Sequence, residues 1–421
     1  MTAPTPQATP QAPRKHLLLV GAGHAHLHVL QMLAQHRPAH LEVTLLTPDA
    51  WQTYSGMVPG YVAGRYALDA CRIALQPLLR AAGVTWIQGL CTGIDAAQSQ
   101  VTLQPTDSSQ KTPQTLRYDL LSLDTGAVFD PLRLAADMPG ALEHTLPVRP
   151  IDDFIDRWQT MVEQRQPGRT PHHQQPPQTA HTPTANATTT TWAFIGAGAA
   201  SVELLMAAHE RLCAAPQAAG SSGSASRIQL VLITGGGEVA AGYAPGIQRR
   251  VLRQLAQRQV QVVRQRCVGA QPGALRLEDG SLLACDGAVL AVGTHAPRWL
   301  QGSGLALVDT GHLQVNPFQQ STSHANVFAA GDVATRADAA HPKSGVYAVR
   351  AGPPLAHNLL AAASGHPLKP HHPPTRTLNL LSCGTRHAIL SWGALHAEGA
   401  WAWWLKDRID RAFVARYASE A

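Results

Sequence analysis

Continuous apolar runs that end at glycine-rich turns form the clearest pattern along this chain. The first run, LLLV at residues 17–20, leads into GAGHAH and then into apolar side chains at Leu27, Leu30 and Leu33. A short apolar run is typical of a buried strand, whereas spacings of three and four residues are typical of a helix. The pattern therefore predicts a strand, a turn and a helix over residues 15–36, followed by a second strand at LEVTLLT.

The same arrangement returns in the middle of the chain. TWAFIGAGAASVELLMAAHERL, at residues 191–212, again joins an apolar run, a glycine turn and a helical pattern, and RIQLVLIT provides the next strand. A strand, a turn and a helix followed by another strand is the unit of doubly wound parallel sheets. Two such units predict an α/β protein with two Rossmann-like domains.

Three segments lack any apolar periodicity. The start, MTAPTPQATPQAP, is a polar tail, QRQPGRTPHHQQPPQTAHTPTANATTTT joins the two units, and AAPQAAGSSGSASR interrupts the second unit. Polar tracts of low complexity cannot bury enough apolar surface to fold, so we expect a disordered tail and a disordered insertion between the two units. The smaller Gly/Ser insertion in the second unit, like the longer one, is expected to be dispensable for the fold. His172 and His173 are adjacent in the longer insertion, but we interpret them as members of the polar tract and not as metal ligands.

Composition and charge exclude several classes of protein. The chain has 421 residues, 45% of them hydrophobic, and a formal net charge of +6. Its Lys and Arg residues are scattered, so nucleic-acid binding is not indicated. No apolar run approaches the roughly 18 residues of a membrane-spanning helix, and the start does not resemble a signal peptide. We expect a cytoplasmic protein whose six cysteines are reduced, since they lack CxxC and zinc-binding spacing.

The first turn has the residues that a dinucleotide site needs. At the carboxyl end of a parallel strand, glycine lets the backbone approach a pyrophosphate, and the following helix offers free N–H groups. Gly21 and Gly23 fit this role, while His26 holds the position of the usual third glycine. His24 and His28 lie one helical turn apart. Without a third ligand nearby, we interpret them as polar residues over a phosphate site and not as a metal site.

The second turn has the same chemistry. Gly196 and Gly198 form the turn, Ser201 is small enough to replace the third glycine, and Glu203 lies one turn into the helix. A carboxylate beside the positive end of a helix would repel phosphate. Glu203 is therefore expected to face the reacting end of the ligand, and a carboxylate on the helix surface is the alternative.

Neither unit has the acidic residue that usually ends the second strand and binds the ribose hydroxyls. The two strands end as TLLTPD and LITGGGE. Thr47 or Asp49 would take that role in the first unit, and Thr234 or Glu238 in the second. The choice between NADH and NADPH therefore stays open.

Two further motifs connect the units to a known family. HANVFAAGDVAT contains an apolar strand that ends at Gly331 and Asp332, and YDLLSLDTGAVFDP ends its strand at Thr125 and Gly126. Together with two dinucleotide turns in one chain, these motifs resemble the flavoproteins with two dinucleotide-binding domains, the pyridine nucleotide-disulfide oxidoreductase superfamily. In that superfamily the first turn holds FAD, the second holds NAD(P)H, and the Asp of the GD motif binds the FAD ribityl chain.

The chain lacks the redox cysteine pairs of the disulfide reductases, since WQTYSGMVPGYVAG stands where one such pair would be. This stretch and HPKSGVYAVRAGPPLAHNLL resemble segments of type II NADH:quinone oxidoreductases. Those enzymes usually carry two glutamines where this chain has Arg350 and Ala351, so the acceptor stays open. The turn GHAHLHVL and the segment LNLLSCGTRH resemble most closely the flavoprotein module that is fused to, or encoded beside, selenophosphate synthetase.

The resemblance implies a domain order and a set of cofactor contacts. The NAD(P) domain would be inserted in the FAD domain. The implied order is a tail (1–14), the first segment of the FAD domain (15–150), a linker with the disordered insertion (151–191), the NAD(P)H domain (192–303), the second segment of the FAD domain (304–370) and C-terminal strands with an amphipathic helix (371–421). FAD, with NADH or NADPH as co-substrate, would contact Gly21, Gly23, His24, Ala25, His26, Thr47, Asp49, Pro59, Cys91, Thr125, Gly126, Gly196, Gly198, Ala199, Ala200, Ser201, Gly293, Gly331, Asp332, Gly345 and Val346.

The implied reaction is hydride transfer from NAD(P)H to flavin N5, after which electrons pass to a small-molecule acceptor, with quinone as one candidate. Negative charge would develop near flavin N1, where something positive should meet it. Ser344 can cap a helix that begins at Gly345, whose first amides would face that charge, with Lys343 beside them. Glu203 would help to seat the nicotinamide. We therefore predict Glu203 and Lys343 as the catalytic residues.

Two alternatives remain at this point. The chain could be a flavin-bearing regulatory or scaffold partner with little turnover. It could also act on sulfur or selenium compounds through Cys383, if that thiol approaches the flavin. A buried structural cysteine is the simpler interpretation of Cys383.

The C-terminal segment GAWAWWLKDRIDRAFVARYASEA predicts an amphipathic helix. Its expected apolar face contains Trp401, Leu405, Ile409, Ala412 and Phe413. Trp403 and Trp404 fall outside that face, and exposed indoles beside Lys and Arg suit a membrane interface or a partner groove. Packing on the FAD domain is the alternative. The expected partners are thus the acceptor, the inner face of a membrane in peripheral contact and, from the resemblance, selenophosphate synthetase.

Overall fold

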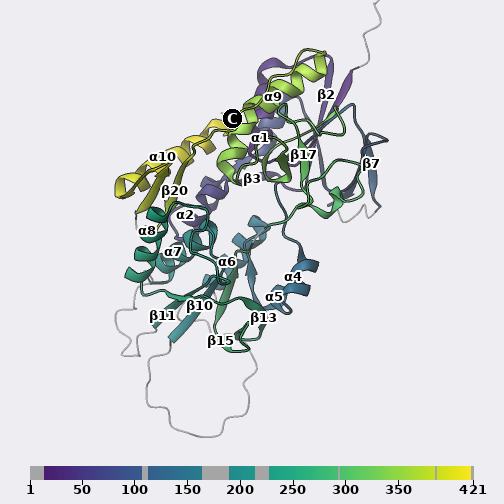
Figure 1. Ribbon diagram of the computed structural model, residues 1–421. Coiled ribbons are helices and arrows are strands. Elements are labelled where there is room, and N and C mark those ends of the chain that lie inside the picture. The colour runs from purple at the N-terminus through teal and green to yellow at the C-terminus, as the bar shows by residue number, and fades with distance from the viewer. Residues whose placement is uncertain are drawn as a thin grey trace, which may run out of the picture.

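The computed structural model describes residues 14–106, 112–163, 189–213, 227–292, 294–384 and 386–418. The bulk of the expected tail and of the two expected insertions, with His172 and His173, and the expected contact Gly293 lie outside these residues. Two parallel sheets with their helices form two lobes, and the C-terminal elements lie along both (Figure 1). The predicted α/β fold with two Rossmann-like domains is confirmed.

The first sheet takes strands from both sides of the second domain in the sequence. In sheet order its strands are β18 (Val327–Ala329), β8 (Leu120–Leu123), β1 (Lys15–Val20), β2 (Leu41–Thr47), β5 (Thr85–Asp95), β6 (Gln100–Pro105) and β7 (Gln114–Arg117). The strands from β18 to β5 are parallel, whereas β6 and β7 pair antiparallel. One face is covered by α1 (His24–His36), α3 (Leu75–Ala82) and α9 (Gly345–Ser364).

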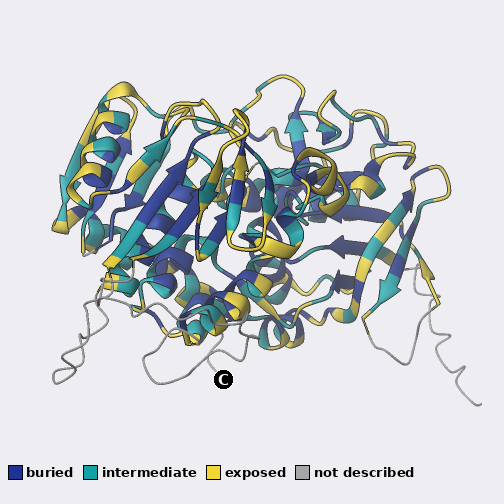
Figure 2. Ribbon diagram, turned by 90° about the horizontal axis from the view of Figure 1, so that it is seen from below, coloured by how far each residue is buried: buried dark blue, intermediate teal, exposed yellow. Residues whose placement is uncertain are grey.

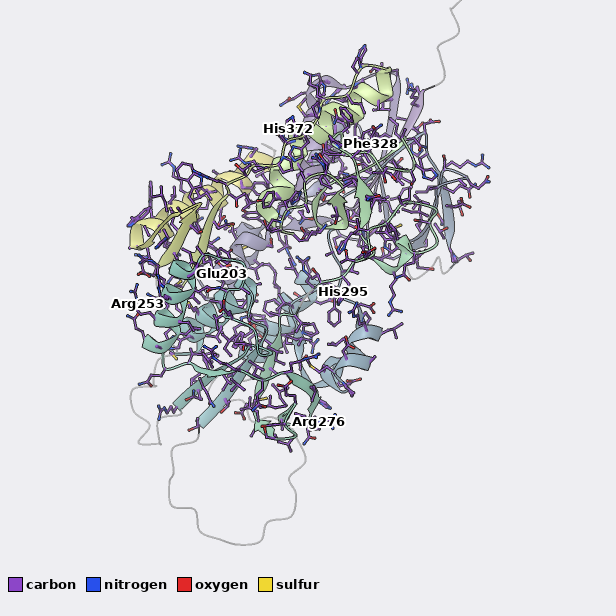
Figure 3. The ribbon with its side chains drawn as sticks, viewed as in Figure 1. Glu203, Arg253, Arg276, His295, Phe328 and His372 are labelled. Atoms are coloured by element: carbon purple, nitrogen blue, oxygen red, sulfur yellow. The ribbon has the colours of Figure 1, made fainter. Side chains whose placement is uncertain are left out.

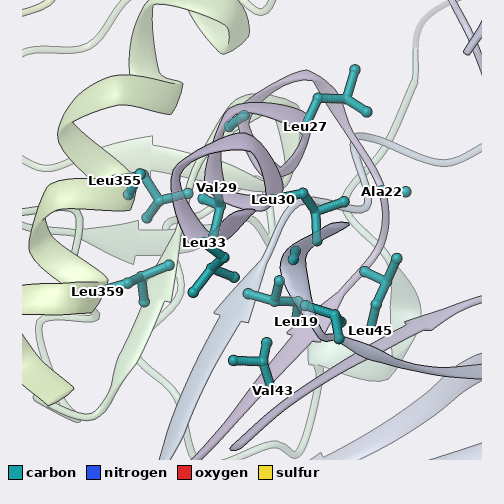
Figure 4. Close-up of a cluster of buried hydrophobic side chains, with 14 of the residues drawn as sticks. Leu19, Ala22, Leu27, Val29, Leu30, Leu33, Val43, Leu45, Leu355 and Leu359 are labelled. Carbon is teal, nitrogen blue, oxygen red and sulfur yellow. The ribbon is translucent and has the colours of Figure 1, made fainter. Parts of the chain in front are cut away.

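Strand β1 is buried on both faces, which explains its uninterrupted apolar sequence. Leu19 packs in the core that α1 and α9 cover, beside Leu30 and Leu355 (Figure 4). Leu18 points to the opposite face, where it lies in a second core with residues of β6 and β17 (Leu313–Val315). The two helices and the two cores hold the β1–α1 turn at the edge of a rigid sheet.

The second sheet is also built from parallel strands covered by helices. In sheet order its strands are β12 (Gln261–Val263), β11 (Arg227–Ile233), β10 (Thr189–Ile195), β16 (Gly287–Leu290) and β9 (Leu146–Pro147), all parallel. Its helices are α7 (Ala199–Cys213), α8 (Pro245–Gln257) and α6 (Ile151–Glu163). An antiparallel sheet of β13 (Cys267–Gln271), β14 (Ala274–Leu277) and β15 (Leu282–Ala284) lies beside it. Figure 2 shows the central strands as buried along most of their length.

The structure differs from the expected linker at residues 151–163, which form helix α6. Phe154, Ile155 and Trp158 are buried in the core of the second sheet, and the Trp158 ring packs edge-on against Trp192 at 5.5 Å. These apolar positions form one helical face, although Asp156 and Arg157 separate Ile155 from Trp158 in the sequence. Helix α6 therefore packs within the second domain.

The C-terminal unit consists of β20 (Leu378–Ser382), β21 (Ala388–Trp392), β22 (Leu395–Gly399) and α10 (Ala400–Tyr417). Leu381 and Ile389 of its sheet join the core of the second domain, whereas Phe413 and Tyr417 of α10 join the core of the first. The unit therefore bridges the two domains. No helix among the described residues is long and apolar enough to cross a membrane.

The predicted apolar face of α10 is wrong at three of its positions. Trp401 is 53% exposed and Ile409 is 41% exposed, and Ala412 is also exposed. The buried face contains Ala402, Lys406, Asp410, Phe413 and Tyr417, in which Asp410 is 5% exposed. An ion pair, which hydropathy alone would place in solvent, decides which side of the helix faces inward.

Shorter elements connect the sheets and surround the edges where the strands end. They are β3 (Trp51–Thr53), η1 (Ser55–Met57), α2 (Val58–Val62), η2 (Leu68–Cys71), β4 (Arg72–Ala74), α4 (Pro131–Asp137), α5 (Ala141–His144), η3 (Arg298–Leu300), η4 (Gly331–Val333) and β19 (Ala334–Arg336). Among them η1 contacts the C-terminal helix, η4 lies beside Asp124 at the β1–α1 turn, and α2 packs on α7.

Candidate functional site

The β1–α1 turn is too tight for any residue but glycine. Gly21 has φ +85°, and its N–H donates to the Leu46 carbonyl at 2.9 Å. A Cβ at Gly21 would lie 2.6 Å from the Asp124 carbonyl oxygen, and a Cβ at Gly23 would lie 2.5 Å from the Asp124 carboxyl. The backbone of the turn is thus packed directly against the end of β8, which requires glycine at both positions.

His26, in place of the usual third glycine, is a structural residue of this turn. It is fully buried, with Nδ1 2.6 Å from the Gly21 carbonyl oxygen and Nε2 2.8 Å from Ser122 Oγ. Burial lowers the pKa of His26 to about 4, so the imidazole is neutral. Its N–H donates to Asp124 Oδ2 at 2.8 Å. Both its ring and its amide are therefore engaged within the protein.

Asp124 is the residue at this turn that the sequence did not reveal as functional. It directly follows β8 and is only 3% exposed. Its carboxylate accepts the N–H groups of Ala25 and His26 at the start of α1. The only signal in the sequence is an acidic residue at the end of an apolar strand, in LSLDTG, and that signal does not indicate the partner.

The end of β18 and the start of α9 meet the same turn. Gly331, the first residue of η4, has φ +71°, and a Cβ there would lie 2.7 Å from Asp124 Oδ1. Helix α9 begins at Gly345 as predicted, but its N-cap Ser344 makes no side-chain cap hydrogen bond. A Cβ at Gly345 would lie 3.9 Å from His24 Cε1. The first amides of α9 thus open beside the β1–α1 turn without a side-chain cap.

His24 lies between these elements in an aromatic cluster. Its ring is 5.5 Å from that of Tyr54 and 5.6 Å from that of Phe413, and the Tyr54 and Phe413 rings stack at 4.4 Å. Burial, helped by the charge of Arg149, lowers the pKa of His24 to about 4. Its Nε2 is buried and has no hydrogen-bond partner among the described residues. Pro59, also predicted as a contact, is buried in α2 on the segment that follows Tyr54.

A buried polar network connects the two domains through α10. Lys406 Nζ donates to the Gly56 carbonyl at 2.8 Å and to Asp410 Oδ2 at 2.7 Å, and Tyr54 Oη donates to Asp410 Oδ1 at 3.2 Å. Burial lowers the pKa of Lys406, but the Asp410 and Glu203 carboxylates outweigh it and raise that pKa overall. The network therefore holds a fixed positive charge between η1 and α7.

Glu203, predicted to face the reacting end of a nicotinamide, lies where the second domain meets the C-terminal unit (Figure 3). It is partly buried, and its Oε1 accepts the N–H of Ser382 at 2.6 Å. Burial raises the pKa of Glu203, and the charge of Lys406 opposes that shift. The side chain is thus directed toward the interdomain network and not into solvent, which disfavours the alternative of a surface carboxylate.

We expect Lys406→Met to lower the free energy of unfolding by about 3 kcal/mol, because it leaves the Asp410 carboxylate buried without its cation. Chemical denaturation monitored by circular dichroism measures this change. Arg408→Met is the matched control, since Arg408 is exposed on the same helix and its loss should cost less than about 0.5 kcal/mol. Equal stability of the Lys406 variant and the control would contradict a structural role for the buried pair.

The second glycine turn repeats the tight geometry of the first. Gly196 has φ +128°, and a Cβ there would lie 2.4 Å from the Ala291 carbonyl oxygen. Gly198 has open space around it, and Ala199 and Ala200 begin α7. Ser201 is fully buried, and its hydroxyl has no hydrogen-bond partner among the described residues. Ser201 therefore fills the third-glycine position as a small packing residue.

The expected ribose contacts lie at the ends of the second strands. Thr47 is buried at the end of β2, and Asp49 is exposed two residues later. In the second domain Thr234 is buried, whereas Glu238 is exposed. Each pair thus offers one buried hydroxyl and one exposed carboxylate at a sheet edge.

The remaining predicted contacts are distributed around the first domain. Cys91 lies at a bulge of β5, and Thr125 and Gly126 follow Asp124. Asp332 and Val346 are near the β1–α1 turn, because they follow Gly331 and Gly345 in η4 and α9. Among the described residues no group of three or more His, Cys, Asp or Glu side chains could hold a metal ion.

Lys343 lies just before α9, as its position in the sequence predicts. Its ammonium donates to the Ala334 carbonyl and to Thr335 Oγ1. Desolvation lowers the pKa of Lys343 to about 8, and the charge of Asp332 opposes that shift. The cation is therefore held near the GD motif by the strand that follows it.

The structure disfavours a reactive role for Cys383. Its side chain is fully buried in the core of the second domain, with Sγ 3.6 Å from the Leu381 carbonyl oxygen. Burial, helped by the charge of Glu203, raises the pKa of Cys383 to about 12. Because thiol chemistry requires an accessible thiolate, the alternative that used Cys383 on sulfur or selenium compounds loses its nucleophile.

The first turn fits the pyrophosphate half of a dinucleotide. Glycine stands at the three positions where a Cβ would meet the Asp124 backbone or carboxyl: Gly21, Gly23 and Gly331. Backbone that needs glycine for close approach, beside two helix N-termini, is the arrangement by which doubly wound domains bind a pyrophosphate. The orphaned His24 Nε2 is a further polar atom within this region.

Comparisons with known proteins agree with this geometry. The structure resembles sulfide:quinone oxidoreductase from Aquifex aeolicus at 15% identity, over 96% of this chain and 91% of that chain, with a TM-score of 0.72. It resembles NDH2 from Plasmodium falciparum, solved with NADH, at 12% identity over 97% and 99% of the two chains, with a TM-score of 0.74. A water-forming NADH oxidase from Lactobacillus brevis, bound to NADH, matches at 18% identity over 90% and 75%, with a TM-score of 0.67.

These solved structures support the fold alone, because their sequence identities are low. No curated protein sequence matches the chain. The family model for pyridine nucleotide-disulphide oxidoreductases matches residues 15–359, which include both glycine turns, the GD motif and helix α9. Members of this family typically bind FAD and NAD(P)H. The chain belongs to the pyridine nucleotide-disulphide oxidoreductase family.

Proposed function

We propose that this protein is an FAD-dependent oxidoreductase that takes hydride from NADH or NADPH and passes the electrons to a small-molecule acceptor. The observation that carries the proposal is the pair of turns at Gly21 and Gly196, each too tight for a Cβ and each followed by a helix at a parallel sheet edge. FAD, when bound, supplies a ring system that accepts hydride at N5 and releases electrons to a second substrate.

The proposed FAD site is the first turn together with the elements that meet it. The backbone amide of His24 would bind the pyrophosphate, Asp332 the ribityl chain, and the open start of α9 the region of negative charge. Gly23 would contribute through close approach of its backbone, because its own N–H already donates to the Asp124 carbonyl oxygen. The other proposed contacts are Ala25, His26, Thr47, Asp49, Pro59, Cys91, Thr125, Gly126, Gly331, Gly345 and Val346. His26 would act through packing, because its own donors are already engaged.

The proposed nucleotide site is the second turn. Gly196, Gly198, Ala199 and Ala200 would offer backbone to the pyrophosphate, and Ser201 would keep α7 close to the sheet. Gly293 remains a proposed contact from the sequence. Thr234 or Glu238 would hold the ribose, so the proposal covers both NADH and NADPH.

Glu203 and Lys343 are the proposed catalytic residues. Lys343 and the amides of α9 would stabilise negative charge that develops during the reaction, because a cation and a helix N-terminus act in the same direction. Glu203 would seat the nicotinamide and exclude water at the domain junction. Burial raises its pKa and so favours a proton on the carboxyl near the site, whereas the Lys406 cation opposes that shift.

The proposed acceptor and partners are based on the sequence resemblance and on the exposed residues of α10. Quinone is a candidate acceptor, although Arg350 and Ala351 replace the usual glutamines and Ala351 is buried against α1. Trp401 and Trp404 on the exposed side of α10 would suit peripheral contact with a membrane. Association with selenophosphate synthetase rests on the sequence resemblance alone.

The proposal predicts a yellow protein that NADH or NADPH bleaches. The full chain is purified, its visible spectrum is recorded, and each nucleotide is added in turn without oxygen. A flavin band that bleaches with either nucleotide would establish hydride transfer and identify the preferred co-substrate. A flavin that stays oxidised with both nucleotides would favour a scaffold or regulatory partner. A colourless protein that FAD does not reconstitute would overturn the proposed site.

A further inference from the structure

A buried carboxyl stands in the centre of the proposed FAD site. Asp124 directly follows β8, and its carboxyl lies against Gly23 and Gly331, close enough that a Cβ at either glycine would come within 2.7 Å of it. Its Oδ2 accepts the His26 N–H at 2.8 Å, and the Ala25 N–H donates to the same carboxyl. Asp124 therefore caps α1 from a neighbouring strand, a role usually played by the residue before the helix.

The negative charge of an ionised Asp124 would repel the negative charge of the proposed ligand. FAD brings a doubly negative pyrophosphate to the same helix N-terminus, next to the carboxylate of Asp332. Besides Asp332, the titratable group in contact with Asp124 is His26, and His24 lies on the same turn of α1; both histidines are neutral above about pH 5. The charge of Lys343, ahead of α9, acts on Asp332, and its pKa is about 8. Among the described residues no cation is shown in contact with Asp124 itself.

We propose that Asp124 is a positioning residue that binds FAD in its protonated, neutral form, so that the binding of FAD takes up a proton. A neutral Asp124 carboxyl can still accept the α1 amides through one oxygen. Its other oxygen carries the proton and can act as a hydrogen-bond donor. The anionic carboxylate would instead repel the pyrophosphate across a buried, poorly screened contact. This inference rests on the proposed function, because it assumes that the first turn holds FAD.

The environment of Asp124 shifts the carboxyl toward the neutral form even without a ligand. Burial raises the pKa of Asp124 to about 7, the Ala25 and His26 amides oppose that shift, and the charge of Asp332 adds to it. A pyrophosphate nearby raises the pKa further. FAD affinity is therefore highest when Asp124 is protonated in the free protein. It falls as the pH rises through the pKa of Asp124 in the free protein.

The test compares FAD binding to flavin-free full-length protein between pH 6.5 and 8.5. For the wild type we expect the dissociation constant to rise about tenfold over this range, since one titrating group gives at most tenfold per pH unit. Asp124→Asn keeps the shape and remains neutral, so its dissociation constant should rise clearly less steeply than that of the wild type and should be the lower one at pH 8.5. Any slope that remains in this variant is assigned to Lys343, whose pKa of about 8 lies in the same range. Asp119→Asn is the matched control, because Asp119 is exposed at the opposite end of β8 and should leave the wild-type profile unchanged.

A second measurement works without any variant. Calorimetric titration of the wild type with FAD at pH 7.5, in two buffers of different ionisation enthalpy, should report uptake of a substantial fraction of one proton per FAD. Equal pH profiles for the wild type and Asp124→Asn, or no proton uptake, would overturn the role of Asp124 while the FAD site stands. Failure of the wild type to bind FAD at any pH would instead overturn the proposed function.

Discussion

Gly21→Ala is expected to remove FAD from the protein. The alanine would have to adopt φ near +85°, which costs roughly 1–2 kcal/mol for a residue with a Cβ. Its Cβ would also lie 2.6 Å from the Asp124 carbonyl oxygen, and β8 cannot retreat because it pairs with β1 and β18. The turn must therefore shift, and we expect FAD affinity to fall at least about 100-fold, equivalent to roughly 2.7 kcal/mol. Equilibrium titration of flavin fluorescence measures this loss.

The control for this prediction is Gly93→Ala. Gly93 lies in β5 of the same domain, with no positive φ, and a Cβ there would make ordinary contact with Thr102 at 3.6 Å. This variant should retain FAD as the wild type does. The comparison shows whether FAD is lost because of the geometry of the turn or because any glycine of the domain is replaced by alanine. Stoichiometric, tightly held flavin in the Gly21 variant would contradict the assignment of this turn as the FAD site.

The second large effect is expected at the other turn. Gly196→Ala should lower kcat/KM for NADH or NADPH by at least about 100-fold, because φ is +128° and the Cβ would lie 2.4 Å from the Ala291 carbonyl oxygen. FAD should remain bound, since the first domain has its own core. Steady-state assays with ferricyanide as acceptor and the visible spectrum of the purified variant measure the two properties separately.

Gly198→Ala distinguishes a protein clash from a ligand clash at that turn. Its Cβ would meet no protein atom within 4 Å, so the variant should match the wild type in thermal stability and in bound FAD. If the turn receives the pyrophosphate of NAD(P)H, the added methyl group should raise KM by about tenfold with a smaller effect on kcat. Unchanged KM values in both variants would mean that the nucleotide binds elsewhere.

Much of the fold follows from patterns within single segments. A buried apolar strand, a glycine turn and a helix form a local unit, so residues 15–36 and 191–212 predict their structure without distant partners. The start of α9 at Gly345 is likewise visible in the chain. The predicted face of α10 failed because hydropathy assigns Trp401 and Ile409 inward and Lys406 outward, whereas the Lys406–Asp410 pair is satisfied in the interior.

The sequence by itself determined the two doubly wound domains, the glycines of both turns and the family, because these depend on local backbone geometry and on the order of motifs. The tertiary structure decided which polar groups lie together. Asp124 and His26 are 98 positions apart, and Lys406 reaches Gly56 across 350 positions, distances at which no local pattern identifies a partner. The same folding buried Cys383, which disfavours its reaction. Packing of distant segments against one another, which no single segment encodes, buried Asp124 and His26 and thereby shifted their pKa values.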